Sequence, residues 1–184
     1  MKKTYIYLLF GLMVIAQIVA SAQIVYKHET VINSGNVYKF TTAPIDPSDP
    51  FRGKYIVLDF DINSFPTTDE DWNYGEKAYL YLGKNANGYA YIDTLSKTKL
   101  ANNPNDYILV ELGSHYNGKI HFDLPFDTYY MEESKAYDAE LLYRENNRRG
   151  EAQEVYAVVH IQEGTHVLTD VVVNGISIKD AVKK

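Results

Sequence analysis

Charged residues gather in one proline-rich stretch of the chain. Two carboxylates, Asp46 and Asp49, precede Arg52, Gly53 and Tyr55. Carboxylates in such loops cap turns by accepting backbone N–H bonds, and an arginine can form a forked pair with a carboxylate. The chemistry expected of this stretch is therefore ion pairing or binding.

The prolines make this stretch stiff before it packs against anything. Pro44, Pro47 and Pro50 fix φ and bias the residue before each of them toward extended conformations. Gly53 then permits a positive φ or a close backbone approach. We expect a rigid entry loop that leads into a strand.

Two interpretations of these residues remain open. In the structural one, Arg52 pairs with Asp46 or Glu133 and pins the loop to a helix as a corner. In the functional one, Asp46, Arg52 and Tyr55 form a ligand or partner site together with Glu133 and Glu140. We favour the structural interpretation, because caps and salt bridges already explain these residue types.

Other catalytic arrangements are weak. Glu132, Glu133 and Glu140 offer paired carboxylates for acid/base work, yet acids near a helix start more often serve the helix dipole. His121 and Asp123 share one strand face and could seed a two-ligand metal site, but an ordinary hydrogen-bonded histidine is the commoner case. We predict no catalytic residue and no metal site, and an enzymatic activity stays an open question that leans toward none.

Composition excludes several classes of chemistry. The 184 residues contain no cysteine, which excludes disulfides, thiol nucleophiles and iron–sulfur clusters. No Walker loop, G-x-G-x-x-G or G-x-S-x-G is present, so we predict no cofactor. The formal charge is −6 and no basic patch occurs, which argues against nucleic acid as a partner.

The N-terminus carries the clearest signal of location. Lys2 and Lys3 precede an uncharged, mostly apolar run that reaches Tyr26. A helix over residues 5–25 would be roughly 31 Å long, enough to cross the hydrocarbon core. The two lysines favour the cytoplasmic side, which places the following domain in the periplasm or outside. We expect an anchor over residues 1–26 and an exported domain over residues 27–184.

Cleavage of this segment is the alternative. Ala20-Ser21-Ala22 is a small-residue site of the kind that signal peptidase cuts, and cleavage after Ala22 would give a secreted protein. Because the apolar run continues through Ile24 and Val25, we favour retention in the cytoplasmic membrane.

Alternating apolar residues predict a β-rich domain. A first strand is expected at residues 37–42, and residues 54–62 place Ile56, Leu58 and Phe60 on one apolar face. Three hairpins are predicted: residues 77–83 with 89–95, residues 108–112 with 119–124, and residues 155–161 with 167–173. Residues 64–75 are expected to form a loop, and Asn174-Gly175 to turn into a strand at 176–178. Residues 132–147 predict the one helix of the domain. The fold class is mainly β, an antiparallel sandwich or barrel-like meander.

The proline-rich block resembles the signature of the GDYXXLXY proteins, bacterial membrane-anchored proteins named after their motif P-x-D-P-x-D-x-x-R-G-D-Y-x-x-L-x-Y. The matching residues are Pro44, Asp46, Pro47, Asp49, Arg52, Gly53, Tyr55 and Leu58. Lys54 stands in place of the motif aspartate and Phe60 in place of its last tyrosine. Residues 129–136 are similar to the aromatic pair and glutamate that open the family's one helix. The resemblance implies companions among multi-pass membrane proteins.

Three functions are compatible with these patterns. The first is a membrane-anchored accessory or interaction domain. The second is a carbohydrate- or peptide-binding module that uses the tyrosine-rich face of residues 79–91. A carboxylate-based hydrolase ranks last, because the sequence names no substrate for it.

Overall fold

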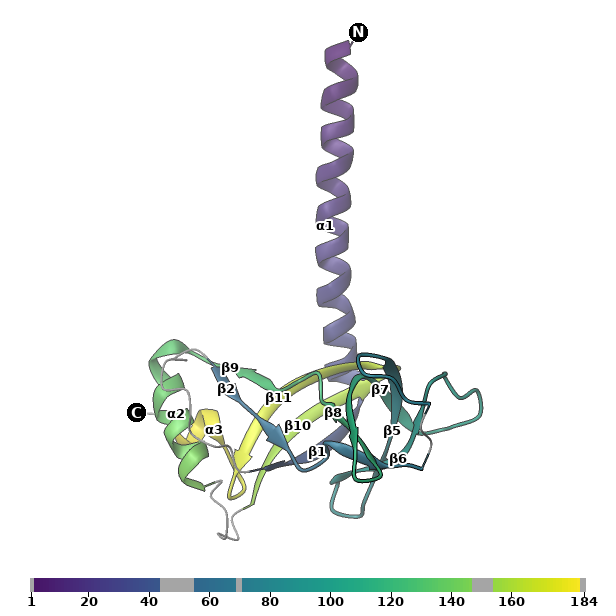
Figure 1. Cartoon of the computed structure of the whole chain (residues 1–184). Coiled ribbons are helices and arrows are strands. Elements are labelled where there is room, and N and C mark those ends of the chain that lie inside the picture. The colour runs from purple at the N-terminus through teal and green to yellow at the C-terminus, as the bar shows by residue number, and fades with distance from the viewer. Residues whose placement is uncertain (1, 44–54, 69–70, 147–153, 183–184) are drawn as a thin grey trace.

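Two antiparallel five-stranded sheets form most of the domain. The computed structural model describes residues 2–43, 55–68, 71–146 and 154–182. The first sheet has the strand order β12-β11-β10-β1-β3 and the second has the order β4-β8-β7-β5-β6, while β2 and β9 form a separate pair. Together they make a near-closed barrel, which Figure 1 shows below a long N-terminal helix.

The first sheet consists of β1 (Asn36–Ala43), β3 (Asp59–Phe60), β10 (Val155–Gln162), β11 (Thr165–Val173) and β12 (Ile176–Ser177). The second consists of β4 (Ser64–Pro66), β5 (Lys77–Lys84), β6 (Ala90–Ser96), β7 (Asp106–Tyr116) and β8 (Lys119–Asp123). β2 (Tyr55–Val57) pairs with β9 (Thr128–Tyr130). The expected mainly antiparallel β fold is confirmed.

Tight turns with positive φ angles set the registers of the hairpins. Asn117-Gly118 has φ values of 51° and 69°, and Glu163-Gly164 has φ values of 47° and 80°. Two successive residues with positive φ match the right-handed twist of the flanking strands. All three predicted hairpins are present, as β5–β6, β7–β8 and β10–β11.

The strand predicted over residues 54–62 is wrong in its extent. The chain forms β2 and β3 instead, in two different sheets, and the break falls at Leu58, whose N–H donates to the Asp127 carbonyl at 2.7 Å. The predicted apolar face is nevertheless correct, because Ile56, Leu58 and Phe60 are all buried.

Three short elements also differ from expectation. The predicted loop over residues 64–75 begins with strand β4, and β9 was not predicted. Ile178, expected to end a strand, begins the short helix α3 (Ile178–Ala181). Such elements of two to four residues are too short to show a hydrophobic period.

Two contacts between distant segments and one chain connection close the barrel. The Lys39 N–H of β1 donates to the Gly88 carbonyl at 3.0 Å, which joins β1 to the β5–β6 turn. Ile108 of β7 bridges to Gly164 in the β10–β11 turn. On the third side, the chain passes from β3, which pairs with β1, to β4, which pairs with β8.

Aromatic side chains fill the centre of the barrel. The rings of Phe40, Phe60 and Phe126 meet edge to face, with centroids 5.0–5.9 Å apart. All three are buried within a larger cluster of apolar residues from both sheets. Edge-to-face packing of this kind adds to the stabilisation that apolar burial provides.

Helix α2 (Glu133–Asn146) covers one end of the domain, where Figure 1 shows it beside α3 and the β2–β9 pair. Its buried face consists of Ala136, Ala139 and Tyr143. These positions follow helical spacing, and the helix predicted over residues 132–147 is confirmed.

Helix α1 (Lys2–Ser34) is one uninterrupted helix that projects away from the barrel (Figure 1). Its large apolar side chains from Tyr5 to Tyr26 are exposed. Its last turns pack on β10 and β11, where Val31 is buried and the Ser34 hydroxyl donates to Gln162 Oε1 at 3.1 Å. We call this contact the foot of α1. It joins the apolar helix directly to the barrel, with no intervening linker.

Candidate functional site

The corner predicted from the sequence is described only in part. Asp46, Asp49, Arg52 and Gly53 lie outside the described residues. Tyr55 is the first residue of β2, where its ring lies 5.7 Å from the ring of Tyr130 on β9.

The helix residues of the predicted corner lie on α2. Glu133 begins α2 and Glu140 is half-buried on it. β2 packs against α2, so the structure brings the strand of Tyr55 beside the helix of both glutamates. The binding role of these residues stays a prediction.

Two motif positions within the described residues, Leu58 and Phe60, have an architectural role. Leu58 and Phe60 are 3% and 4% exposed, and Phe60 packs on Phe40 and Phe126. A phenylalanine suits this site, because an apolar ring needs no hydrogen-bond partner when buried. Phe60 therefore fits the position at which the motif has tyrosine.

His121 and Asp123 lie on the outer face of β8, as their alternation predicted. His121 is half-buried and Asp123 is exposed, while Ile120 and Phe122 between them face the core. Within the part of the chain that the structure describes, no group of three or more His, Asp or Glu side chains has a geometry that could hold a metal ion.

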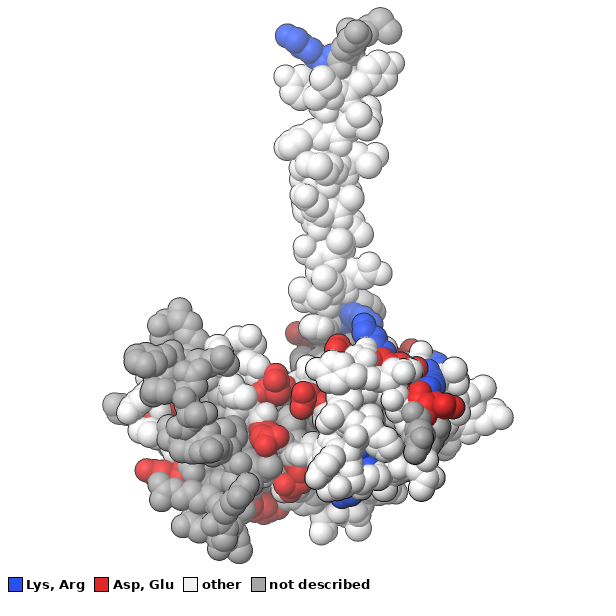
Figure 2. All heavy atoms as spheres, viewed as in Figure 1, with Lys and Arg blue, Asp and Glu red and all other residues white. Residues whose placement is uncertain are grey.

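Carboxylates from three segments line a small groove that the sequence did not reveal. Asp59, Asp123 and Asp127 border a cavity of about 70 Å³. Burial, and then the charge of Asp59, raises the pKa of nearby Asp61. Figure 2 shows acidic side chains gathered on one face of the molecule, between the barrel and the end that carries α2. The face they form is strongly anionic.

The tyrosines of the β5–β6 hairpin have separate environments. Tyr79 and Tyr81 alternate with buried Leu80, so they face outward. The ring of Tyr91 lies over Gly83, whose added Cβ would come within 2.2 Å of that ring. Tyr89 instead packs edge-on against another ring, that of Tyr156.

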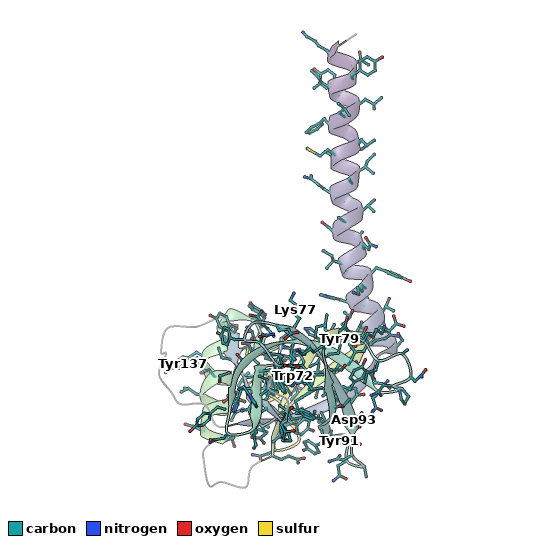
Figure 3. The ribbon with its side chains drawn as sticks, turned by 45° about the vertical axis from the view of Figure 1, so that its right-hand side comes forward. Trp72, Lys77, Tyr79, Tyr91, Asp93 and Tyr137 are labelled. Carbon is teal, nitrogen blue, oxygen red and sulfur yellow. The ribbon has the colours of Figure 1, made fainter. Side chains whose placement is uncertain are left out.

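Figure 3 brings this outer face forward, with Lys77, Tyr79, Asp93 and Tyr91 spread along it. Trp72 packs instead against the core cluster, with the Lys97 ammonium 5.2 Å from the centroid of its ring. The tyrosines of residues 79–91 therefore fall into groups: Tyr79 and Tyr81 pack on Tyr107, whereas Tyr89 and Tyr91 make contacts elsewhere.

A half-buried histidine lies near the foot of α1. His166 on β11 packs its ring 5.3 Å from that of Phe126, and its Nδ1 is buried with no hydrogen-bond partner among the described residues. Burial lowers the pKa of His166, a hydrogen bond to the Pro125 backbone raises it in part, and nearby His28 lowers it. The neutral imidazole is therefore the favoured form in the folded state.

We expect the domain to lose stability between neutral and mildly acidic pH because of His166. Its pKa is lower folded than unfolded, so above the unfolded value near 6.5 both states are neutral and nothing is lost. As the pH falls through that value, the unfolded state gains the proton first. Thermal unfolding of a His166→Gln variant should show a smaller fall in Tm between pH 7.5 and pH 5 than the wild type.

His115→Gln provides the matched control, since His115 is an exposed histidine near the end of β7. It should retain the full wild-type fall in Tm. An equal fall in the wild type and in His166→Gln would contradict the assignment.

These features define a class: a small β-barrel domain carried directly on a long, apolar N-terminal helix. The chain belongs to the GDYXXLXY protein family, whose model matches residues 17–171. That match includes the second half of α1, the whole second sheet, and the first sheet except β12 and the end of β11. No curated protein and no solved structure matches the chain.

Proposed function

We propose that this protein is a single-pass membrane protein whose barrel serves as an accessory or interaction domain outside the cytoplasmic membrane, with an integral membrane protein as partner. The observation that carries the proposal is α1, a helix long and apolar enough to cross a membrane. Exposure of so many large apolar side chains in water would be costly, whereas hydrocarbon accommodates them.

The foot of α1 supports retention of the helix. Lys27 is the first charged residue after the apolar run, and buried Val31 follows only four residues later. At 1.5 Å per residue the barrel begins about 6 Å beyond the end of the apolar run. An interaction domain held this close to the bilayer faces the short external loops of membrane proteins.

The position of the Ala20-Ser21-Ala22 site also favours retention. It lies inside the continuous helix, with apolar Ile24 and Val25 beyond it. Signal peptidase sites normally follow the apolar region and do not lie within it.

Expression of the full chain in bacterial cells tests both parts of this proposal. We expect the protein in carbonate-washed membranes, with an intact mass that includes residues 2–22. Photocrosslinking residues placed at exposed Leu12 in α1 and at exposed Tyr130 on β9 should both yield adducts with integral membrane proteins. Recovery of a soluble protein with the mass of residues 23–184 would contradict retention of the helix.

A Leu12→Arg variant is the control for insertion. An arginine at the helix centre costs about 2.5–3.5 kcal/mol on insertion scales and should reduce the membrane-bound fraction. Recovery of the wild type without any integral membrane protein in its adducts would refute the interaction part of the proposal and leave the anchor unaffected.

A further inference from the structure

The connection from β6 to β7 passes over the outer face of β5. Both strands flank β5 in the sheet, so residues 97–105 have to cross it. The Leu100 N–H donates to the Tyr81 hydroxyl at 2.6 Å, and Lys99 Nζ lies 4.9 Å from the centroid of the Tyr107 ring. This segment, the crossover loop, is thus fastened to two outward-facing tyrosines. The crossover loop covers Tyr81, which is only 1% exposed.

A cavity of about 210 Å³ lies beside the crossover loop. Its walls combine Tyr81 of β5, Asn105 of the loop, Asp106 and Tyr107 of β7, and Glu163 of the β10–β11 turn. This volume is many times the roughly 10–15 Å³ that one water needs, yet lies below the 300 Å³ or more of sites for drug-sized ligands. A ligand of about one ring fits it.

Hydrogen bonds fix most of the walls of the cavity. The Tyr107 hydroxyl donates to the Glu163 carbonyl at 3.2 Å. Asp106 Oδ2 accepts from Asn36 Nδ2 at 2.8 Å and from the Tyr38 hydroxyl at 3.0 Å. Burial, and then the charge of Asp106, raises the pKa of Tyr38, so this phenol stays a donor to the carboxylate. The walls are therefore ordered without a ligand.

Other polar atoms of the same walls retain free capacity. The Tyr81 hydroxyl accepts the Leu100 N–H, and within the described ranges no acceptor receives its own hydrogen. Among those residues the Asn105 carboxamide likewise has no hydrogen-bond partner. The Asp106 carboxylate points to the other face of β7, where it accepts from Tyr38 and Asn36. The phenol and the carboxamide supply donors and acceptors side by side next to the ring of Tyr107.

We propose that this cavity binds a single neutral sugar ring. Each sugar hydroxyl both donates and accepts, which matches a phenol beside a carboxamide, and the Tyr107 ring adds an apolar wall. The charged side chains of the cavity, Lys99, Asp106 and Glu163, carry two negative charges and one positive. That balance disfavours phosphate and other anions.

Binding of methyl glycosides to the full-length protein in detergent micelles tests the proposal. The probes are the methyl glycosides of glucose, galactose, mannose and N-acetylglucosamine, with inorganic phosphate and glycine as comparison ligands. Saturation-transfer NMR should detect saturable binding of at least one glycoside at millimolar concentration, and weaker or no binding of phosphate and glycine.

Two variants and one matched control locate the site. Tyr81→Phe removes one hydroxyl and Asn105→Ala removes the carboxamide, and each should weaken binding at least tenfold. Tyr79→Phe removes an equivalent hydroxyl from the same strand and face outside the cavity, and should leave affinity unchanged. Absence of saturable glycoside binding, a preference for phosphate, or equal affinity in Asn105→Ala and wild type would each overturn the proposal.

Discussion

Replacing Phe40 with alanine should lower the free energy of unfolding by about 3–5 kcal/mol, the largest effect of any substitution considered for this chain. Phe40 is fully buried, with its ring centroid 5.0 Å from that of Phe126 and 5.9 Å from that of Phe60. The two sheets converge on these rings, so neither sheet can close the space on its own. The cavity left behind therefore adds to the lost transfer free energy.

Urea unfolding followed by the fluorescence of Trp72 measures this change, since Trp72 is the single tryptophan of the chain. Trp72 is half-buried in the connection between β4 and β5. Its fluorescence therefore reports on the barrel and not on α1. Tyr74→Ala is the control, because Tyr74 is 84% exposed and its loss should change stability by no more than about 0.5 kcal/mol. A loss below 1 kcal/mol for Phe40→Ala would contradict the central position assigned to this ring.

A Gly35→Ala substitution should destabilise the protein by about 1–3 kcal/mol and release the foot of α1. A Cβ at Gly35 would lie 2.5 Å from the Val31 carbonyl oxygen and 3.1 Å from that of Ile161. Both contacts are with backbone, which cannot rotate away as a side chain can. The Gly35 N–H also donates to that Val31 oxygen at 2.9 Å, so the strain falls on the helix end itself.

Spin labels measure whether the foot is released. Because the chain has no cysteine, labels can be attached at Tyr26→Cys and Tyr116→Cys, two exposed positions on α1 and β7. The distance distribution between them should be narrow in the parent protein and broader once Gly35→Ala is added. Gly11→Ala is the matched control in the same helix, since its Cβ would meet nothing within 4 Å. Equally narrow distributions in all three proteins would contradict the release of the foot by Gly35→Ala, and a broad distribution in the parent protein would contradict a rigid foot.

Local sequence signals predicted the elements that depend on neighbouring residues. Asn117-Gly118 and Glu163-Gly164 form turns with positive φ, and Ala136, Ala139 and Tyr143 form the buried face of α2. In each case the physical cause acts over a few residues, either a turn that tolerates positive φ or a helical period. Such features need no knowledge of the rest of the fold.

Pairing between distant segments could not be predicted in the same way. The alternation around Leu58 indicated one strand, but the partner of its N–H is the Asp127 carbonyl, far along the chain. This partner breaks the strand and sends β3 to the first sheet. Hydrophobic periodicity indicates which face of a strand is buried, but it does not indicate which other strand pairs with it.

The two candidate sites differ in the same respect. The proline-rich corner was recognisable because its residues are contiguous in sequence. The cavity beside the crossover loop joins Tyr81, Asn105 and Glu163, which belong to three separate segments. Each of these residues is ordinary in its own segment. Only the closure of the barrel brings them together, so no local pattern marks them as a group.

The pairing of β1 with β10 bears on how the chain acquires its structure during synthesis. The Thr42 hydroxyl on β1 donates a hydrogen bond to the carbonyl of Val155 on β10, which lies 113 residues later in the chain. At roughly 5–20 residues per second, the first strand of the barrel waits about 6–23 seconds for its partner. During that time the unpaired edge of β1 is open to wrong pairings, such as those that lead to aggregation. This interval ends only when the β10–β11 hairpin is made and β10 pairs with β1.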